Sequence, residues 1–139
     1  MKGCLMMIGL ARKAGCLVLG EDSIRTAVGD HKAKVIFTAA DATPNTVKKA
    51  KRFAETGKIP FVEMPFTKEE FGAAAGVGEI AAAAVTNPEI ACGITEKLRA
   101  ADPEKYGEAA DFLQQRAKAQ RERKKGTASG RTAKRKENA

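Results

Sequence analysis

The chain has 139 residues and a formal net charge of +8, with 43% hydrophobic residues, 5% aromatic residues and no tryptophan. This length allows one domain with a short extension, and the core must be built mainly from small and aliphatic side chains. Three irregularly spaced cysteines and one histidine argue against a zinc site or a disulfide scaffold, and they favour the reducing cytoplasm. No apolar run is long enough to cross a membrane.

The positive charge is concentrated at one end of the chain. Residues 1–115 hold fifteen basic and fifteen acidic side chains, whereas residues 116–139 hold ten basic and two acidic ones. Within the neutral part, residues 1–63 carry a balance of +5 and residues 64–115 a balance of −5. We therefore expect a polyanionic partner such as nucleic acid, bound by the first half of the domain and by the tail.

Predicted helices and strands alternate along the chain. Helices are expected at 3–13, 21–30, 44–57, 67–75, from 87 to about 101, and at 103–125, and extended segments at 16–19, 34–39, 59–64 and 80–85. Thr43 before Pro44 is a favourable helix start, and Thr67 with Glu70 matches a capping box. The alternation predicts an α/β fold, a three-layer α/β/α sandwich around a four-stranded mixed sheet with an extra C-terminal helix and a basic tail.

Three regions are predicted along the chain. Residues 1–101 form the compact domain, and residues 102–125 form an additional basic helix. Residues 126–139 have the composition of a disordered tail. The additional helix carries a thin apolar stripe, made of Tyr106, Ala109, Leu113 and Ala117.

Patterns for catalysis or for cofactor binding are weak. Gly72, Gly76 and Gly78 follow a predicted helix and precede a strand, which is the reverse of the order in a phosphate-binding loop. His31 has no identifiable nucleophile partner, and no carboxylate pair or metal-ligand cluster stands out. The sequence therefore predicts a protein that is not an enzyme and has no cofactor and no metal.

Four stretches of the chain occur in an order and spacing typical of one family. These are Gly20-Glu21-Asp22-Ser23-Ile24-Arg25, Ala33-Lys34-Val35-Ile36, the stretch from Ala40 to Thr46, and Gly72-Ala73-Ala74-Ala75-Gly76-Val77. Over about residues 3–100 the chain resembles the kink-turn-binding ribosomal-protein superfamily (large-subunit "seven-Ae" and "thirty-e" types), in its bacterial YlxQ-like branch. The resemblance implies an RNA site in which a helix N-terminus docks against a sharply bent internal loop. It also implies an apolar loop that covers an extruded base.

The family's RNA signature is Gly-x-Asn-Glu-x-x-Lys at a strand-to-helix junction. Gly20 matches the signature glycine, and Asp22 stands at the asparagine position. Ser23 and Thr26 replace the glutamate and the lysine, and Arg25 lies one residue before the lysine position. By resemblance, these residues form the core of the expected RNA contact.

A second part of the expected site lies in the covering loop. Val77 matches the apolar residue of that loop, and Glu79 stands where some relatives carry arginine. Lys48, Lys49, Lys51 and Arg52 are open to two interpretations, a solvated helix face or a set of phosphate contacts. The complete expected RNA-binding set is Gly20, Glu21, Asp22, Ser23, Arg25, Thr26, Lys34, Asp41, Lys48, Val77 and Gly78.

The function predicted from these observations is recognition of a bent, kink-turn-like structured RNA, ribosomal or another stable RNA, by a cytoplasmic protein. The sequence leaves the oligomeric state open and favours a monomer. The main alternative is a protein–protein adaptor on the same fold with little specific RNA binding. That alternative fits Asp22, which cannot donate a hydrogen bond as asparagine does, and Glu79, which repels phosphate. A weaker alternative is an enzyme, such as an RNA methyltransferase whose substrate domain has this fold.

Overall fold

The computed structural model describes residues 2–133. The helices are α1 (Lys2–Lys13), α2 (Glu21–Gly29), α3 (Pro44–Gly57), α4 (Lys68–Ala75), α5 (Pro88–Ala101) and α6 (Pro103–Ala133). The strands are β1 (Leu17–Leu19), β2 (Val35–Thr38), β3 (Phe61–Glu63) and β4 (Ala82–Val85). Two helix starts follow the predicted capping chemistry, because Thr43 accepts a hydrogen bond from the Thr46 amide and Thr67 forms a complete capping box with Glu70.

The four strands form one mixed sheet in the order β1-β4-β2-β3. Strand β4 is antiparallel to β1 and to β2, and β2 is parallel to β3. Since β1 and β2 both run opposite to β4, their carboxyl ends lie at the same end of the sheet. The chain therefore leaves β1 toward α2 at the same end at which β4 begins.

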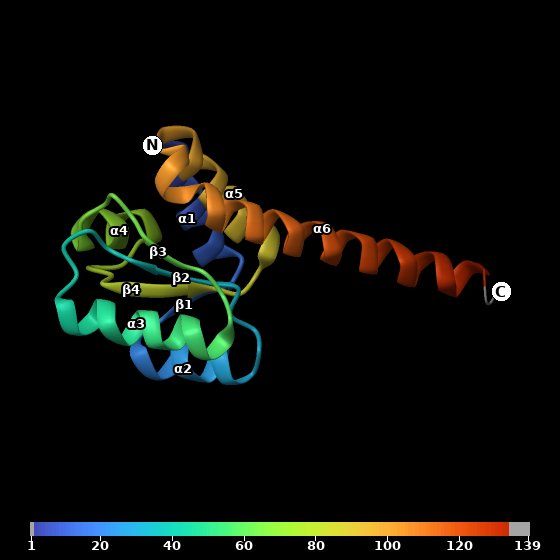
Figure 1. The fold of residues 1–139 in the computed structure, drawn as a ribbon, viewed down its shortest axis with the longest axis horizontal. Coiled ribbons are helices and arrows are strands. Elements are labelled where there is room, and N and C mark those ends of the chain that lie inside the picture. The colour runs from blue at the N-terminus through green and yellow to red at the C-terminus, as the bar shows by residue number, and fades with distance from the viewer. Residues whose placement is uncertain (1, 134–139) are drawn as a thin grey trace.

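Helices cover both faces of the sheet, as Figure 1 shows. Helices α2 and α3 pack on one face through a buried cluster that includes Ile24, Ala50 and Ile36. Helices α1, α4, α5 and α6 lie on the other face, over a larger cluster that includes Val35 and Phe37. Successive β2 side chains thus enter opposite layers, as strand geometry requires. The predicted α/β/α sandwich around a mixed four-stranded sheet is confirmed.

The first half of α6 belongs to the domain core. Tyr106, Ala110 and Leu113 are buried, and the Tyr106 hydroxyl donates a hydrogen bond of 2.9 Å to the Glu63 carbonyl. Ala117 is 1% exposed and is the last buried residue that the structure describes in this helix. The core therefore continues past Ala101.

The remainder of α6 extends away from the domain (Figure 1). The helix continues to Ala133, beyond the expected end at Lys125 and through the first part of the expected tail. Residues 134–139, the rest of that tail, lie outside the described residues. No helix within residues 2–133 is long and apolar enough to cross a membrane.

Strand β4 is shorter than the sequence indicates. It begins at Ala82, not at Ile80. The Ile80 amide donates to the Lys68 carbonyl at the start of α4, so this residue is bonded to a helix instead of to a neighbouring strand. The predicted strand over 80–85 is wrong in its first two residues, and these belong to the loop that follows α4.

Candidate RNA interface

The turn from β1 into α2 is made by Gly20. Its backbone has φ 89° and ψ 143°, a conformation that side-chain-bearing residues rarely adopt. A Cβ atom at this position would have no heavy atom within 4 Å, so the space in front of the turn is open. Gly20 provides no side-chain cap for α2. The first amides of the helix are thus accessible to an external acceptor.

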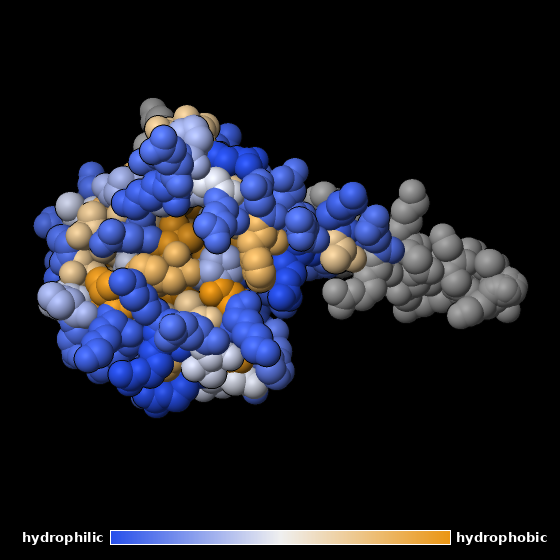
Figure 2. Space-filling model, in the orientation of Figure 1, coloured by the Kyte–Doolittle hydropathy of each residue, from blue (hydrophilic) through white to orange (hydrophobic). Residues whose placement is uncertain are grey.

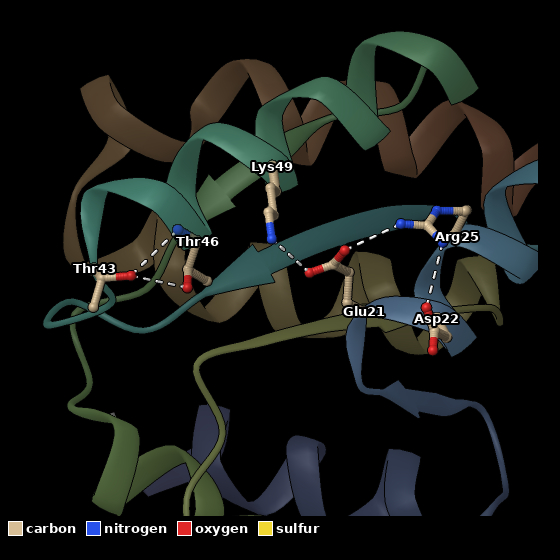
Figure 3. Close-up of polar contacts among 6 residues, drawn as sticks. All are labelled: Glu21, Asp22, Arg25, Thr43, Thr46 and Lys49. Atoms are coloured by element: carbon tan, nitrogen blue, oxygen red, sulfur yellow. Dashed lines mark hydrogen bonds and ion pairs between the residues drawn. The ribbon is translucent and has the colours of Figure 1, made fainter.

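A small charge network links α2 to α3 beside this turn (Figure 3). Glu21 accepts from Lys49 of α3 at 3.0 Å and from Arg25 at 3.1 Å, and Arg25 also contacts Asp22 at 3.3 Å. The hydrogen bond and charge of Lys49 lower the pKa of Glu21. The Arg25 guanidinium lies 5.8 Å from the centre of the Phe53 ring, which orients it further.

The loop of residues 76–81 reaches the same end of the sheet from α4. Gly76 ends α4 in the left-handed conformation, and the Val77 amide donates to the Gly72 carbonyl. A Cβ at Gly72 would lie 2.5 Å from the Gly78 carbonyl oxygen and 2.8 Å from Glu79 Cα. The loop therefore rests directly on α4, in a position that only glycine at residue 72 permits.

The turn and the loop meet at one cavity of about 320 Å³. Gly20 and Glu21 line it together with residues 79–82, whereas the predicted residues Val77 and Gly78 are not among its lining residues. Helix α3 contributes Thr46, Lys49, Ala50 and Phe53, and Ile36 of β2 also lines the cavity. Two stretches separated by more than fifty residues in the chain thus form one concave surface.

Three of the remaining predicted α2 residues lie around a second, more open hollow. Asp22, Ser23 and Thr26 line it together with Asp30 and Lys32 near the other end of α2. The Thr26 hydroxyl donates to the Asp22 carbonyl at 3.0 Å. The expected α2 contact surface is therefore divided: Gly20 and Glu21 lie at the cavity, Asp22, Ser23 and Thr26 lie at the second hollow, and Arg25 lies in the charge network.

Three other residues of the predicted RNA-binding set, Asp41, Lys48 and Lys34, lie elsewhere in the structure. Asp41 accepts from the Lys68 amide at 2.8 Å and so caps α4, which helps to fix the covering loop. Lys48 is exposed on α3, where Figure 2 shows a largely polar surface. Lys34 precedes β2 and its amide donates to the Val85 carbonyl, which places it at the opposite end of the sheet from Gly20. The structure does not bring Lys34 to the cavity.

Several cavity residues were missed by sequence reasoning. Lys49 was grouped with Lys48 and Arg52 on the outer face of α3, but its ammonium group faces Glu21. Thr46, Ala50 and Phe53 follow the helical spacing of one face of α3, a spacing that core packing alone would also produce. The pairing of Lys49 with Glu21 could have been predicted only from the knowledge that α2 packs beside α3.

Two further features concern the metal-binding and thiol groups of the described residues. Within residues 2–133 no group of three or more histidine, cysteine or acidic side chains is arranged to hold a metal ion. Burial raises the pKa of the Cys4 thiol to about 11 and also raises that of Cys16, so both thiols are protonated at neutral pH.

Comparison with known proteins agrees with this architecture. Residues 4–95 match the sequence model of the ribosomal protein L7Ae/L30e/S12e/Gadd45 family, and the chain belongs to this family. It is similar to the RNA-binding protein YlxQ of Enterococcus faecium, with 40% identity over 58 residues, 42% of this chain and 56% of that protein. The RNA-binding protein YlxQ of Bacillus subtilis (strain 168) is 33% identical over 70 residues, 50% of this chain and 65% of that protein.

These matches confirm the resemblance to the YlxQ-like branch, although each spans less than two thirds of the relative. Two solved structures share the fold. A protein of unknown function from Bacillus halodurans C has a TM-score of 0.60 at 21% identity, with 80% of this chain and 96% of that chain covered. The 15.5kD RNA binding protein of Giardia lamblia has a TM-score of 0.56 at 20% identity, with 69% and 84% covered.

Proposed function

We propose that this protein binds a structured RNA that bends sharply at an internal loop, as in a kink-turn. The observation that supports the proposal is the meeting of the Gly20 turn with the loop of residues 76–81 at one cavity. The family and the relatives named for RNA binding support the choice of ligand. Bent RNA is suitable because its opened internal loop exposes bases that a regular A-form helix hides.

Each part of the interface has a distinct task in this proposal. The RNA backbone approaches the open turn at Gly20, where free amides of α2 donate hydrogen bonds. The cavity accommodates an extruded base, and residues 79–81 of the loop line it. Exposed cations on α3, among them Lys48 and Arg52, attract flanking phosphates without sequence preference.

The test compares affinity for a kink-turn RNA and for a straight duplex of matched length. Gly20→Glu adds bulk and negative charge at the turn, and we expect at least a tenfold loss of kink-turn affinity, equivalent to about 1.4 kcal/mol. Gly20→Ala controls for backbone strain, since any side chain here adopts a positive φ. Gly29→Glu adds the same charge at the other end of α2, where a Cβ also meets open space.

Circular dichroism and thermal melting establish that all three variants are folded. Normal binding by Gly29→Glu with a large loss in Gly20→Glu supports the proposed site. If folded Gly20→Glu binds both RNAs as the parent does, the site is elsewhere. An absence of preference between kink-turn and duplex in the parent protein would instead favour the protein–protein adaptor.

A further inference from the structure

The cavity combines apolar lining residues with two glutamates and one lysine. Ile24, Ile36 and Phe53 contribute to the walls, a composition suited to the flat faces of a nucleobase. Glu21 and Glu79 both line the cavity, as does Lys49. A base that enters between these walls therefore brings its polar edge close to carboxylate oxygens.

The carboxylates of Glu21 and Glu79 differ in their hydrogen-bond and ion-pair partners. Both oxygens of Glu21 are engaged, one with Lys49 and the other with Arg25. Glu79 is exposed, and its carboxylate has no hydrogen-bond or ion-pair partner among residues 2–133. Its backbone is nevertheless held, because the preceding residue rests on Gly72 and the following amide donates to Lys68. The Glu79 carboxylate can therefore accept hydrogen bonds from a ligand, and the backbone that carries it is held in place at the cavity.

We propose that Glu79 selects the base that enters this cavity, with preference for bases that carry N–H donors, guanine above all, and discrimination against uracil. This inference rests on the proposed function, because it concerns the extruded base of a bent RNA. It adds a base preference that the presence of an apolar pocket alone would not produce.

The preference follows from hydrogen-bonding capacity. An ionised carboxylate only accepts hydrogen bonds. Guanine presents two adjacent donors, its ring N–H and its amino group, which match the two oxygens of one carboxylate, and charge-assisted pairs of this kind are strong. Adenine and cytosine each offer an amino donor. Uracil has one N–H between two carbonyl oxygens, and those oxygens are repelled by the carboxylate.

The experiment uses four kink-turn RNAs that differ only in the extruded nucleotide, with the full chain and two variants. Glu79→Gln removes the charge with little change in shape, and Glu55→Gln makes the same change on the exposed part of α3, outside the cavity. For the parent and for Glu55→Gln we expect guanine to bind about tenfold more tightly than uracil, the ratio given by one charge-assisted hydrogen bond. In Glu79→Gln this ratio falls toward one.

Methyl chemical shifts of Ile24 and Ile36 report whether the base occupies the cavity. Large shifts with the guanine RNA, together with the loss of preference in Glu79→Gln, support the inference. Equal affinity of the parent for all four RNAs, an unchanged preference in Glu79→Gln, or unmoved methyl signals would each overturn it while the binding of bent RNA stands. Equal binding of the kink-turns and the duplex would overturn both the inference and the proposed function.

Discussion

Arg25 shares its guanidinium group between two carboxylates at the start of α2. It lies 3.1 Å from Glu21 and 3.3 Å from Asp22, and all three side chains are largely exposed. Exposed ion pairs contribute little to stability because water and salt screen them. Their main consequence concerns binding, since an RNA phosphate must compete with these carboxylates for Arg25.

Asp22→Asn tests this competition. The substitution removes one partner of Arg25 and one negative charge near the proposed site, so kink-turn affinity should rise by up to about fivefold. Asp30→Asn removes the same charge at the other end of α2 and should have little effect. Titrations at two salt concentrations measure both variants, and the gain should shrink at high salt. A loss of affinity in Asp22→Asn would mean that Asp22 itself contacts the RNA.

In the described part of the core, one buried hydroxyl group lacks a hydrogen-bond partner. Thr38 is 0% exposed, and its Oγ1 forms no hydrogen bond among residues 2–133. Thr38→Val removes the unpaired oxygen and should stabilise the fold by about 1 kcal/mol, which raises the melting temperature by about 3 °C. Thr95 is the matched control, because its buried hydroxyl donates to the Ala91 and Cys92 carbonyls. Thermal melts in which Thr38→Val is destabilised would show that this hydroxyl is satisfied in solution.

Among the elements, helix starts were the most predictable from sequence. Thr43 with Pro44, and Thr67 with Glu70, are local signals whose chemistry is complete within one turn of helix. The start of β4 was not predictable in this way. Ile80 and Ala81 are as apolar as the strand that follows, and only the position of α4 beside them directs the Ile80 amide to Lys68.

The candidate site was predictable in its parts but not in its arrangement. The turn at Gly20 and the loop at Val77 were both identified, because their residues match a family pattern. Lys34 belongs to the same predicted set, but the structure places it away from both. Its position at the opposite end of the sheet follows from the strand order and direction, which depend on contacts distant in sequence.

The loop of residues 76–81 depends on the absence of a side chain at Gly72. In Gly72→Ala the new Cβ would overlap the Gly78 carbonyl, so α4 or the loop must move. We expect a destabilisation of about 1–3 kcal/mol and a weaker kink-turn affinity, because the loop lines the cavity. Gly29→Ala is the control: its Cβ meets open space, and it should leave stability unchanged or raise it by about 0.4–1 kcal/mol. Urea denaturation compares the two, and equal stabilities would contradict the tight packing at Gly72.

At the scale of the whole molecule, most of the net positive charge lies in the chain that follows the buried part of α6. Residues 121–139 contain eight basic and two acidic side chains, a balance of +6, so residues 1–120 carry the remaining +2 of the total +8. The last buried α6 residue that the structure describes, Ala117, lies just before this boundary. The folded core and most of the net charge can therefore be separated by a single truncation.

We expect a chain that ends at Gln120 to keep the melting temperature of the full chain and its preference for bent RNA over duplex. Its affinity for both RNAs should fall, because a polyanion attracts the basic extension by counterion release. The slope of log affinity against log salt should decrease by about 0.9 for each phosphate contact that is lost. Salt titrations of both chain lengths, with both RNAs, measure these quantities.

A chain that ends at Gln115 provides the comparison that separates charge from folding. This cut also removes Ala117, which is buried, and it leaves Leu113 in the last turn of a helix that frays. We therefore expect its melting temperature to fall, whereas that of the chain ending at Gln120 stays constant. If the chain ending at Gln120 loses its preference for the bent RNA while it stays folded, the basic extension contributes to recognition of the bend and not only to general affinity. If both truncated chains melt like the full chain, the packing of Ala117 contributes nothing measurable to stability.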